Sequence, residues 1–235
     1  MTRSLDVAVI GAGIVGLAHA FSAVERGHRV TLFERSERAC GASIRNFGMV
    51  WPIGQPAGEL HDIALESRAR WLRLSKSAGL WVSPCGSIHL AHRADELTVL
   101  QEFHERSSKL GFECSWLTAE EVLSQSPAVN PDGLLGGLFS PTELCVDSRA
   151  VIGRLPRWLA REHELRCEFR TTVTSIESGH VGSADGRQWD VVSANPTQAL
   201  IDELEKTAEV LAKYGISERA PLFRVEADIV RKRLQ

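Results

Sequence analysis

The chain has 235 residues, of which 43% are hydrophobic and 24% charged, and its formal net charge is −3 at pH 7. This composition is ordinary for a soluble globular protein with one large domain or two small ones. The small negative charge gives no support for binding to nucleic acid or to an anionic membrane, so neither is expected as a partner.

Residues 5–35 predict a βαβ unit. The apolar, partly β-branched run at residues 7–10 is typical of a buried parallel strand. A helix is expected at residues 14–26 and a second strand at residues 29–33, followed by the acidic Glu34. The first strand and the helix are separated by three glycines at G-x-G-x-x-G spacing: Gly11, Gly13 and Gly16. Together these features form the fingerprint of a dinucleotide-binding fold.

Each part of this fingerprint has a physical reason. Gly11 permits a tight turn out of the strand, because it lacks the Cβ that would forbid the conformation. Gly13 lets the backbone approach a pyrophosphate at the positive end of the helix, and Gly16 lets the helix pack closely on the sheet. Glu34 is expected to accept hydrogen bonds from the adenosine ribose, and its charge disfavours the 2′-phosphate of NADP.

The uncharged stretch at residues 7–24 also imitates a signal peptide or a short membrane span. Asp6 beside Arg3, the glycines within the stretch and the acidic Glu34 argue against both interpretations. We therefore expect a cytoplasmic protein with no membrane span.

The cysteines are odd in number, widely spaced and without a C-x-x-C pair: Cys40, Cys85, Cys114, Cys145 and Cys167. This favours reduced thiols over a disulfide framework or a zinc site. We expect all five to be buried structural thiols. His89 and His92 are spaced as metal ligands can be, but no thiol or carboxylate completes the set, so no metal site is predicted.

Residues 40–52 form a predicted loop that mixes small residues, an aromatic side chain, two glycines and a proline. Such a loop is either a plain connection or a ligand-binding segment with donors at Ser43, Arg45 and Asn46. The small residues, placed where a backbone would meet a cofactor, favour the second interpretation.

With the N-terminal βαβ unit, the run GASIRNFGMVW at residues 41–51 resembles the superfamily of FAD-dependent D-amino-acid, glycine and sarcosine oxidases. It is most similar to a subgroup of bacterial FAD oxidoreductases associated with phosphonate-degradation genes. The resemblance covers about residues 5–192. It implies an α/β fold in which a Rossmann-like FAD-binding domain, residues 1–58 and 141–194, carries a partial α+β substrate domain, residues 59–140.

The resemblance also implies FAD as the cofactor and a set of contacts to it. Those nearest the pyrophosphate are the fingerprint glycines with Ile14, Val15, Ala42 and Ser43. Those at the adenosine are Glu34, Arg35 and the backbone of Val173. Those approaching the flavin ring by backbone are Phe47, Gly48 and Met49.

Sequence patterns predict the elements that follow the loop. The expected helices are residues 58–77, 94–110, 119–124 and 148–161, the third beginning with a capping box at Thr118 and Glu121. The expected strands are residues 86–91, 134–139, 172–176 and 189–192, and the last is expected to return to the FAD-binding sheet.

Residues 195–235 differ from the rest, with three of the five lysines and the only tyrosine, Tyr214. A capped helix is expected at residues 197–214. In the resembled superfamily a longer stretch, with most of the substrate-facing sheet, occupies this place. We therefore expect a truncated, rearranged or fused reading frame, with a natural short variant ending in a helical cap as the alternative.

The function implied by the resemblance is oxidation of a small amine, amino acid or aminophosphonate by hydride transfer to FAD. The superfamily's substrate-binding arginine has no counterpart here, so no catalytic residue is predicted. Arg45 is a candidate anion contact, with a loop salt bridge as the alternative. A catalytically incompetent dinucleotide-binding fragment is the second hypothesis, and an NAD-dependent dehydrogenase the third. No oligomeric state is predicted.

Overall fold

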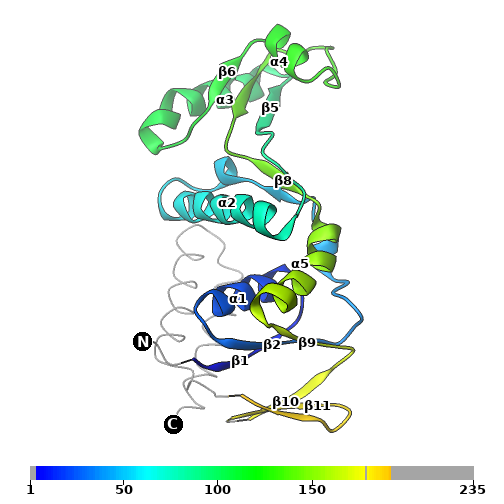
Figure 1. Cartoon of the computed structure of the whole chain (residues 1–235). Coiled ribbons are helices and arrows are strands. Elements are labelled where there is room, and N and C mark those ends of the chain that lie inside the picture. The colour runs from blue at the N-terminus through cyan, green and yellow to red at the C-terminus, as the bar shows by residue number, and fades with distance from the viewer. Residues whose placement is uncertain (1–3, 178, 192–235) are drawn as a thin grey trace. The chain divides into compact units, whose positions relative to one another are not determined.

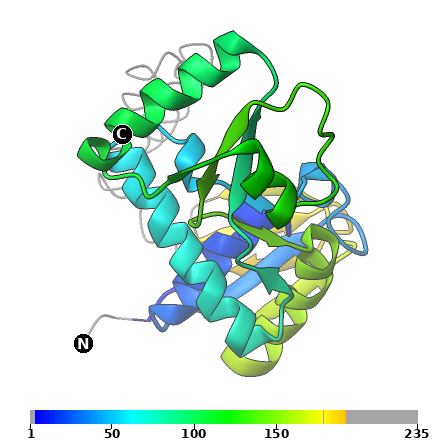
Figure 2. The ribbon, with the colours of Figure 1, turned by 90° about the horizontal axis from the view of Figure 1, so that it is seen from above.

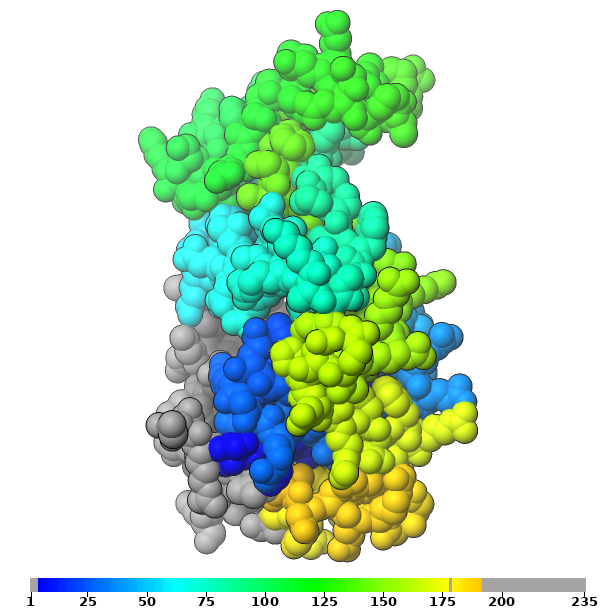
Figure 3. All heavy atoms as spheres, viewed as in Figure 1, coloured from blue at the N-terminus to red at the C-terminus, as the bar shows by residue number. Residues whose placement is uncertain are grey.

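The computed structural model describes residues 4–177 and 179–191, which are coloured in Figure 1 and in the space-filling view of Figure 3. The chain divides into two compact units. Of the described residues, the first unit contains 4–41, 155–177 and 179–191, and the second contains 42–154. The predicted tail helix at residues 197–214 lies outside the described residues. The predicted functional boundaries, at residues 58 and 140, stay predictions.

The first unit is built on a parallel sheet whose strand order is β1-β2-β9. Its strands are β1 (Asp6–Ile10), β2 (Arg29–Glu34) and β9 (Arg166–Phe169). Helix α1 (Ile14–Glu25) makes the crossover from β1 to β2, as the glycine spacing predicts. In Figure 3 the blue N-terminal and yellow C-terminal parts of this unit lie side by side, because β9 pairs with β2.

Two helices cover one face of this sheet (Figure 1). Leu17 and Ala20 of α1 are fully buried, and so is Leu159 of helix α5 (Ser148–His163), whose second half belongs to this unit. The rings of Phe21 and Trp158 join the two helices, with centroids 5.9 Å apart. The apolar faces of both helices therefore supply the core of the unit.

A second, antiparallel sheet completes the first unit. Its strands are β10 (Val173–Glu177), β11 (His180–Ser183) and β12 (Gln188–Asp190). The prediction that residues 189–192 return to the FAD-binding sheet is wrong for Trp189 and Asp190, which pair with β11 instead. A tight turn at Gly186, where φ is +83°, reverses the chain and makes this short hairpin the nearest pairing available. Val192 lies outside the described residues.

The second unit contains two small sheets. The first has the order β3-β8-β4 and consists of β3 (Met49–Val50), β8 (Leu144–Val146) and β4 (Val82–Ser83). The second has the order β5-β7-β6 and consists of β5 (Ser87–Ala91), β7 (Gly136–Ser140) and β6 (Ser115–Leu117). The strand predicted at residues 134–139 is observed as β7, which begins at Gly136 and ends at Ser140.

The helices of the second unit agree closely with those expected from periodicity and capping. They are α2 (Glu59–Ala78), α3 (Ala94–Ser107) and α4 (Ala119–Gln125). Gly79 ends α2 in a left-handed conformation, and the capping box of Thr118 and Glu121 starts α4. Helix α3 packs along β5 and β7 (Figure 2). Three short 3₁₀ turns complete the unit: Ala42–Arg45, Pro52–Gly54 and Ser108–Leu110.

The exposure of the cysteines can be compared with the prediction. The prediction of five buried thiols is wrong for Cys40 and Cys85, which are exposed, while the other three are partly buried. Both exposed thiols lie in irregular segments, where no sheet or helix face covers them.

Within the described ranges, no helix has the length and apolar character needed to cross a membrane.

A buried carboxylate organises the second unit. Glu143 is only 1% exposed, and its side chain accepts hydrogen bonds from three donors. These are the backbone nitrogen of Ile53 at 3.0 Å, the hydroxyl of Ser87 at 3.0 Å and the hydroxyl of Thr142 at 2.8 Å. Because a buried carboxylate is costly unless its oxygens are paired, this arrangement joins the end of the 42–54 segment to β5.

We expect Glu143→Ala to lower the free energy of unfolding by roughly 2–4 kcal/mol, because it leaves buried donors unpaired and opens a cavity. The matched control is Glu66→Ala, which removes an exposed carboxylate paired with Arg70 on α2 and is expected to cost less than about 0.5 kcal/mol. Urea unfolding followed by circular dichroism measures both. Equal losses in the two variants would contradict the anchoring role of Glu143.

Candidate functional site

The candidate site lies in the first unit, at the carboxyl ends of its parallel strands. Ligands of open α/β sheets bind at this edge, where the loops leaving the strands converge. A hollow of about 750 Å³ runs along β1 and α1, from Arg26 and His28 at one end to Gly11 and Gly13 of the loop after β1 at the other. A second hollow, of about 810 Å³, lies at the amino ends of the strands and does not have this topological advantage.

The glycine loop has a geometry that side chains would disrupt. Gly11 has a φ of +98°, and its backbone nitrogen donates a 2.7 Å hydrogen bond to the carbonyl of Phe33. A Cβ atom at Gly16 would lie 1.9 Å from the carbonyl oxygen of Gly11. The start of α1 therefore packs directly against the turn, which only glycine at both positions allows.

The N-terminus of α1 suits an anionic group. The N-cap residue is Gly13, which offers no capping side chain, and the first helical turn contains no acidic residue. Val15, in the same turn, is 69% exposed. The positive end of the helix dipole is thus not compensated by a carboxylate of its own turn, as a diphosphate-binding helix requires.

Glu34 stands between the two loops that follow β1 and β2. It is 8% exposed, and its two carboxylate oxygens accept 3.0 Å hydrogen bonds from the backbone nitrogens of Ala12 and Ser36. Each carboxylate oxygen has a further lone pair, so these bonds leave acceptor capacity for a ribose hydroxyl. The sequence predicts the ribose contact of Glu34 but does not predict its hydrogen bonds to the backbone of Ala12 and Ser36.

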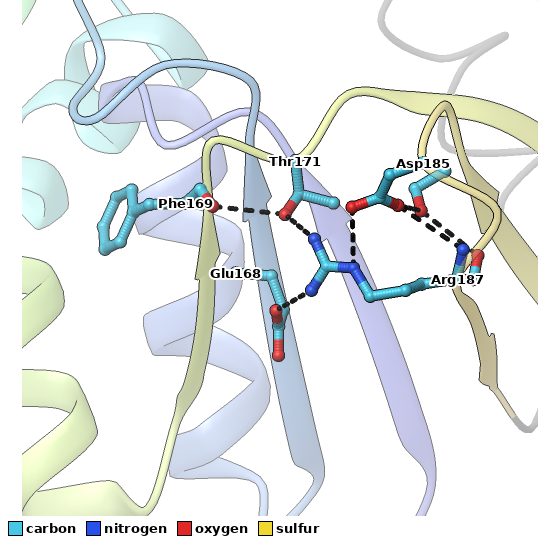
Figure 4. Close-up of polar contacts among 6 residues, drawn as sticks. Glu168, Phe169, Thr171, Asp185 and Arg187 are labelled. Atoms are coloured by element: carbon cyan, nitrogen blue, oxygen red, sulfur yellow. Dashed lines mark hydrogen bonds and ion pairs between the residues drawn. The ribbon is translucent and has the colours of Figure 1, made fainter.

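The polar cluster around Arg187 is also not predicted from the sequence (Figure 4). Its guanidinium donates to Asp185 at 2.8 Å, to Glu168 at 3.1 Å and to the hydroxyl of Thr171 at 2.9 Å. The hydrogen bond to Asp185 is the main cause that raises the pKa of Arg187. The guanidinium also lies 5.0 Å from the ring centroid of Trp189, within cation–π range.

The Arg187 cluster fixes the segment that leads to Val173. Thr171 is buried, and its backbone nitrogen donates a 2.9 Å hydrogen bond to the carbonyl of Glu34. Val173 follows two residues later as the first residue of β10, and Arg35 is exposed beside Glu34. The structure thus brings the glycine loop, Glu34, Arg35 and the approach to Val173 to one edge of the first unit.

The other predicted cofactor contacts belong to the second unit. Ala42 and Ser43 lie in the 3₁₀ turn at Ala42–Arg45. Gly48 has a φ of +74°, and its carbonyl accepts a 2.7 Å hydrogen bond from the nitrogen of Val146. A Cβ atom at Gly48 would lie 1.9 Å from the carbonyl oxygen of Val146, so glycine is required there.

Gly48 is therefore clamped on β8 while its neighbours point outward. Phe47 is 94% exposed and Met49 is 46% exposed. Arg45 is exposed and forms no ion pair with any residue of the described part of the chain, so the salt-bridge alternative has no support there. Contact of this segment with a cofactor bound by the first unit stays a prediction.

Beyond the predicted contacts, an aromatic pair lies at the end of the 42–54 segment. The ring of Trp51 stacks on that of His89 with centroids 5.9 Å apart and an interplanar angle of 22°. His89 is also 3.1 Å from the hydroxyl of Ser87, which donates to Glu143. Burial lowers the pKa of His89, and the charge of Glu143 partly opposes this shift. Within residues 4–177 and 179–191 no three potential metal ligands cluster.

A comparison with protein-family models identifies the family. The model described as "FAD dependent oxidoreductase" matches residues 6–215. The chain belongs to the FAD-dependent oxidoreductase family. This confirms the resemblance to the superfamily of FAD-dependent oxidases, the Rossmann-like fold class and FAD as the cofactor of the family, and it sets aside the NAD alternative. The resemblance to the phosphonate-associated subgroup stays a prediction. The match extends beyond residue 192, where the sequence alone placed its end.

Individual relatives support the same assignment. Glycine oxidase from Geobacillus kaustophilus (strain HTA426) is 28% identical over 196 residues, covering 79% of this chain and 52% of the relative. The crystal structure of glycine oxidase from Geobacillus kaustophilus superposes with a TM-score of 0.69 at 26% identity, covering 81% of this chain and 54% of that one. The chain therefore spans about half the length of these relatives.

A relative with a different substrate is also similar. One subunit of the anaerobic glycerol-3-phosphate dehydrogenase of Escherichia coli (strain K12) is 29% identical over 140 residues, which cover 60% of this chain and 26% of the relative. Family membership alone therefore does not decide between an amine and an alcohol as substrate.

We expect Gly16→Ala to lower the free energy of unfolding by roughly 2 kcal/mol or more, because the added Cβ meets the backbone of Gly11 rather than a movable side chain. The matched control is Gly153→Ala, also within a helix, where a Cβ meets no atom within 4 Å. That variant is expected to be up to about 1 kcal/mol more stable, because alanine favours helix. Thermal unfolding of both variants measures the difference, and a Gly16→Ala variant as stable as the wild type would contradict the close packing.

Proposed function

We propose that this chain binds FAD through its first unit and acts as part of an oxidoreductase whose substrate is a small amine or amino acid. The observation that carries the proposal is the edge formed by the glycine loop, the start of α1, whose N-cap residue is Gly13 and whose first turn has no acidic residue, and the buried Glu34. These groups match an adenosine diphosphate in charge and hydrogen-bonding capacity. The negative charge of Glu34 favours a ribose with free hydroxyls over one with a 2′-phosphate.

The parts of FAD are assigned to separate groups of residues. The start of α1, with Gly13, Ile14 and Val15, would hold the diphosphate. Glu34 would hold the ribose, and the backbone near Val173 the adenine. The 42–49 segment would contribute Ala42 and Ser43 to the diphosphate and the backbone of Phe47, Gly48 and Met49 to the flavin.

When bound, FAD accepts a hydride from the carbon that carries the substrate's amine, and the protein supplies orientation and electrostatics. An amine or amino-acid substrate is supported by the similarity to glycine oxidase. An aminophosphonate is supported by the resemblance of the GASIRNFGMVW run to the phosphonate-associated subgroup. Arg45, exposed and cationic, is the candidate contact for the substrate's carboxylate or phosphonate.

A second candidate function is an FAD-binding module without catalytic activity of its own. The chain spans 52% of the glycine oxidase relative, so the activity of that whole protein is carried over to this chain only as a proposal. The two candidates share the cofactor and differ in whether a substrate reduces it.

We expect the purified chain to retain added FAD through desalting, with flavin bands in its visible absorbance spectrum. Glu34→Gln is expected to weaken FAD binding about 10–100-fold, because its amide group would face a backbone N–H that cannot reorient. The control is Glu37→Gln, which alters an exposed carboxylate paired with Arg170 and should leave the affinity unchanged. Titration of flavin fluorescence measures the affinities. A colourless wild-type protein that retains no added FAD would refute the proposal.

The substrate class is tested by anaerobic addition of small molecules to the FAD-loaded chain. We expect glycine, other amino acids or aminomethylphosphonate to bleach the flavin band, because each carries hydrogen on the carbon beside an amine. Glycerol 3-phosphate and L-2-hydroxyglutarate serve as alcohol controls. Bleaching by the alcohols alone would overturn the amine assignment, and retained FAD with no bleaching by any compound would establish the inactive module.

A further inference from the structure

The histidine of strand β5 lies at the end of a chain of hydrogen bonds that begins at a buried carboxylate. Glu143 accepts a 3.0 Å hydrogen bond from the hydroxyl of Ser87, and the oxygen of this hydroxyl lies 3.1 Å from Nε2 of His89. A serine hydroxyl has one proton, and Ser87 gives it to the carboxylate, so the proton between Ser87 and His89 comes from the imidazole. His89 is thus held with Nε2 protonated and a lone pair on Nδ1.

The position of the imidazole ring is fixed as well. Strand β5 lies at one end of the strand order β5-β7-β6, and His89 pairs with Leu138 of β7. Leu138 shares a core cluster with Ile53, whose backbone nitrogen is bound by Glu143. Trp51 stacks on the imidazole and Ser87 binds its Nε2 edge, so the direction of the Nδ1 lone pair is set by the fold.

This lone pair is available to a ligand. Within residues 4–177 and 179–191, Nδ1 of His89 has no hydrogen-bond partner, and the buried side-chain nitrogens without a partner belong to His61 and Arg68 instead. Solvent therefore reaches Nδ1. Burial lowers the pKa of His89, so its imidazole is neutral near pH 7. A neutral imidazole with one nitrogen anchored and the other open meets the requirements of a general base.

We propose that Nδ1 of His89 accepts a proton from the ammonium group of the substrate. This inference rests on the proposed function, in which the substrate is an amine. An N–H bond of the ammonium breaks, its electron pair stays on the substrate nitrogen, and an N–H bond forms at Nδ1. The substrate then has the nitrogen lone pair that the C=N bond of an imine product requires, and which an ammonium lacks.

The surroundings of His89 suit a group that gains a proton and then releases it. The charge of Glu143 favours the imidazolium and partly opposes the effect of burial. The neighbouring 51–54 segment and β7 contain no charged side chain, and helix α3 contributes Leu100 and Phe103 to the adjoining core. A histidine that served packing alone would need neither the ordered proton on Nε2 nor the open Nδ1.

The first test reads the protonation of His89 in the unaltered chain and needs neither FAD nor a substrate. Nitrogen-15 NMR of the histidine-labelled protein distinguishes a protonated ring nitrogen from an unprotonated one. Near neutral pH we expect Nε2 of His89 to be protonated and Nδ1 to be unprotonated, and the signals that disappear in His89→Gln identify the residue. A proton on Nδ1 with Nε2 bare would overturn the proposal.

The second test follows the rate at which glycine bleaches the flavin band of the FAD-loaded chain, without oxygen and at subsaturating glycine, as the pH is varied. In His89→Gln the amide can still donate to Ser87, but no basic nitrogen remains. We expect this variant to be about 100-fold slower near neutral pH. Its rate should rise about tenfold for each pH unit until the free amine predominates in solution. The unaltered chain should show a flat profile that falls only below the lowered pKa of His89, and the two rates should converge at alkaline pH.

The control is His92→Gln, which removes an imidazole bound to the carbonyl of Asp132 and should leave the pH profile of the unaltered chain unchanged. Bleaching that is equal in the unaltered chain and in His89→Gln at every pH would overturn the role of His89 and leave the proposed function intact. Absence of bleaching in the unaltered chain itself would overturn both, so the two failures are distinguishable.

Discussion

The carboxylate of Glu34 is the constraint on which the candidate site depends. It is nearly inaccessible to solvent, and both of its oxygens accept hydrogen bonds from backbone N–H groups, one in the loop after β1 and one in the turn after β2. A buried carboxylate with fixed donors holds the two chain segments at one separation. The position and conformation of the glycine loop thus follow from the side chain that is also expected to bind the ribose, so structural and ligand-binding roles are joined in one residue.

The segment at residues 42–54 is held in a comparable way by partners distant in sequence. Gly48 is fixed by its hydrogen bond with Val146, and Ile53 is fixed by Glu143. Between these points Met49 and Trp51 are 46% and 42% exposed. Exposing large apolar side chains to water is unfavourable, because it raises the free energy of the protein in solution. A run that is fixed at both ends and still exposes apolar side chains is more consistent with a binding surface than with a plain connection.

What the sequence predicts well is local. The glycine spacing, the left-handed stop at Gly79 and the capping box at Thr118 act within a few residues, so their signals lie together in the sequence. The contacts that the sequence does not predict are long-range. The hydrogen bond between Glu143 and Ile53 joins residues 90 positions apart, and the one between Arg187 and Thr171 joins residues 16 positions apart. The error at Trp189 has the same origin, because an apolar run predicts a strand without naming its partner. Exposure of Cys85 likewise depends on what packs over it.

These limits explain why the cofactor follows from the sequence more readily than the substrate. FAD is recognised through its diphosphate and ribose, and most of the contacts proposed for these two groups come from one βαβ unit. A substrate is selected by side chains gathered from several segments beside the flavin, and relatives in this family act on glycine and on glycerol 3-phosphate, as their names state. The exposed Arg45 is the contact proposed for an anionic substrate group, but a single charge would not separate an amino acid from a phosphate ester. The discrimination must come from groups that recognise the heteroatom on the reacting carbon, and hydride transfer to flavin is therefore the step that reports on it.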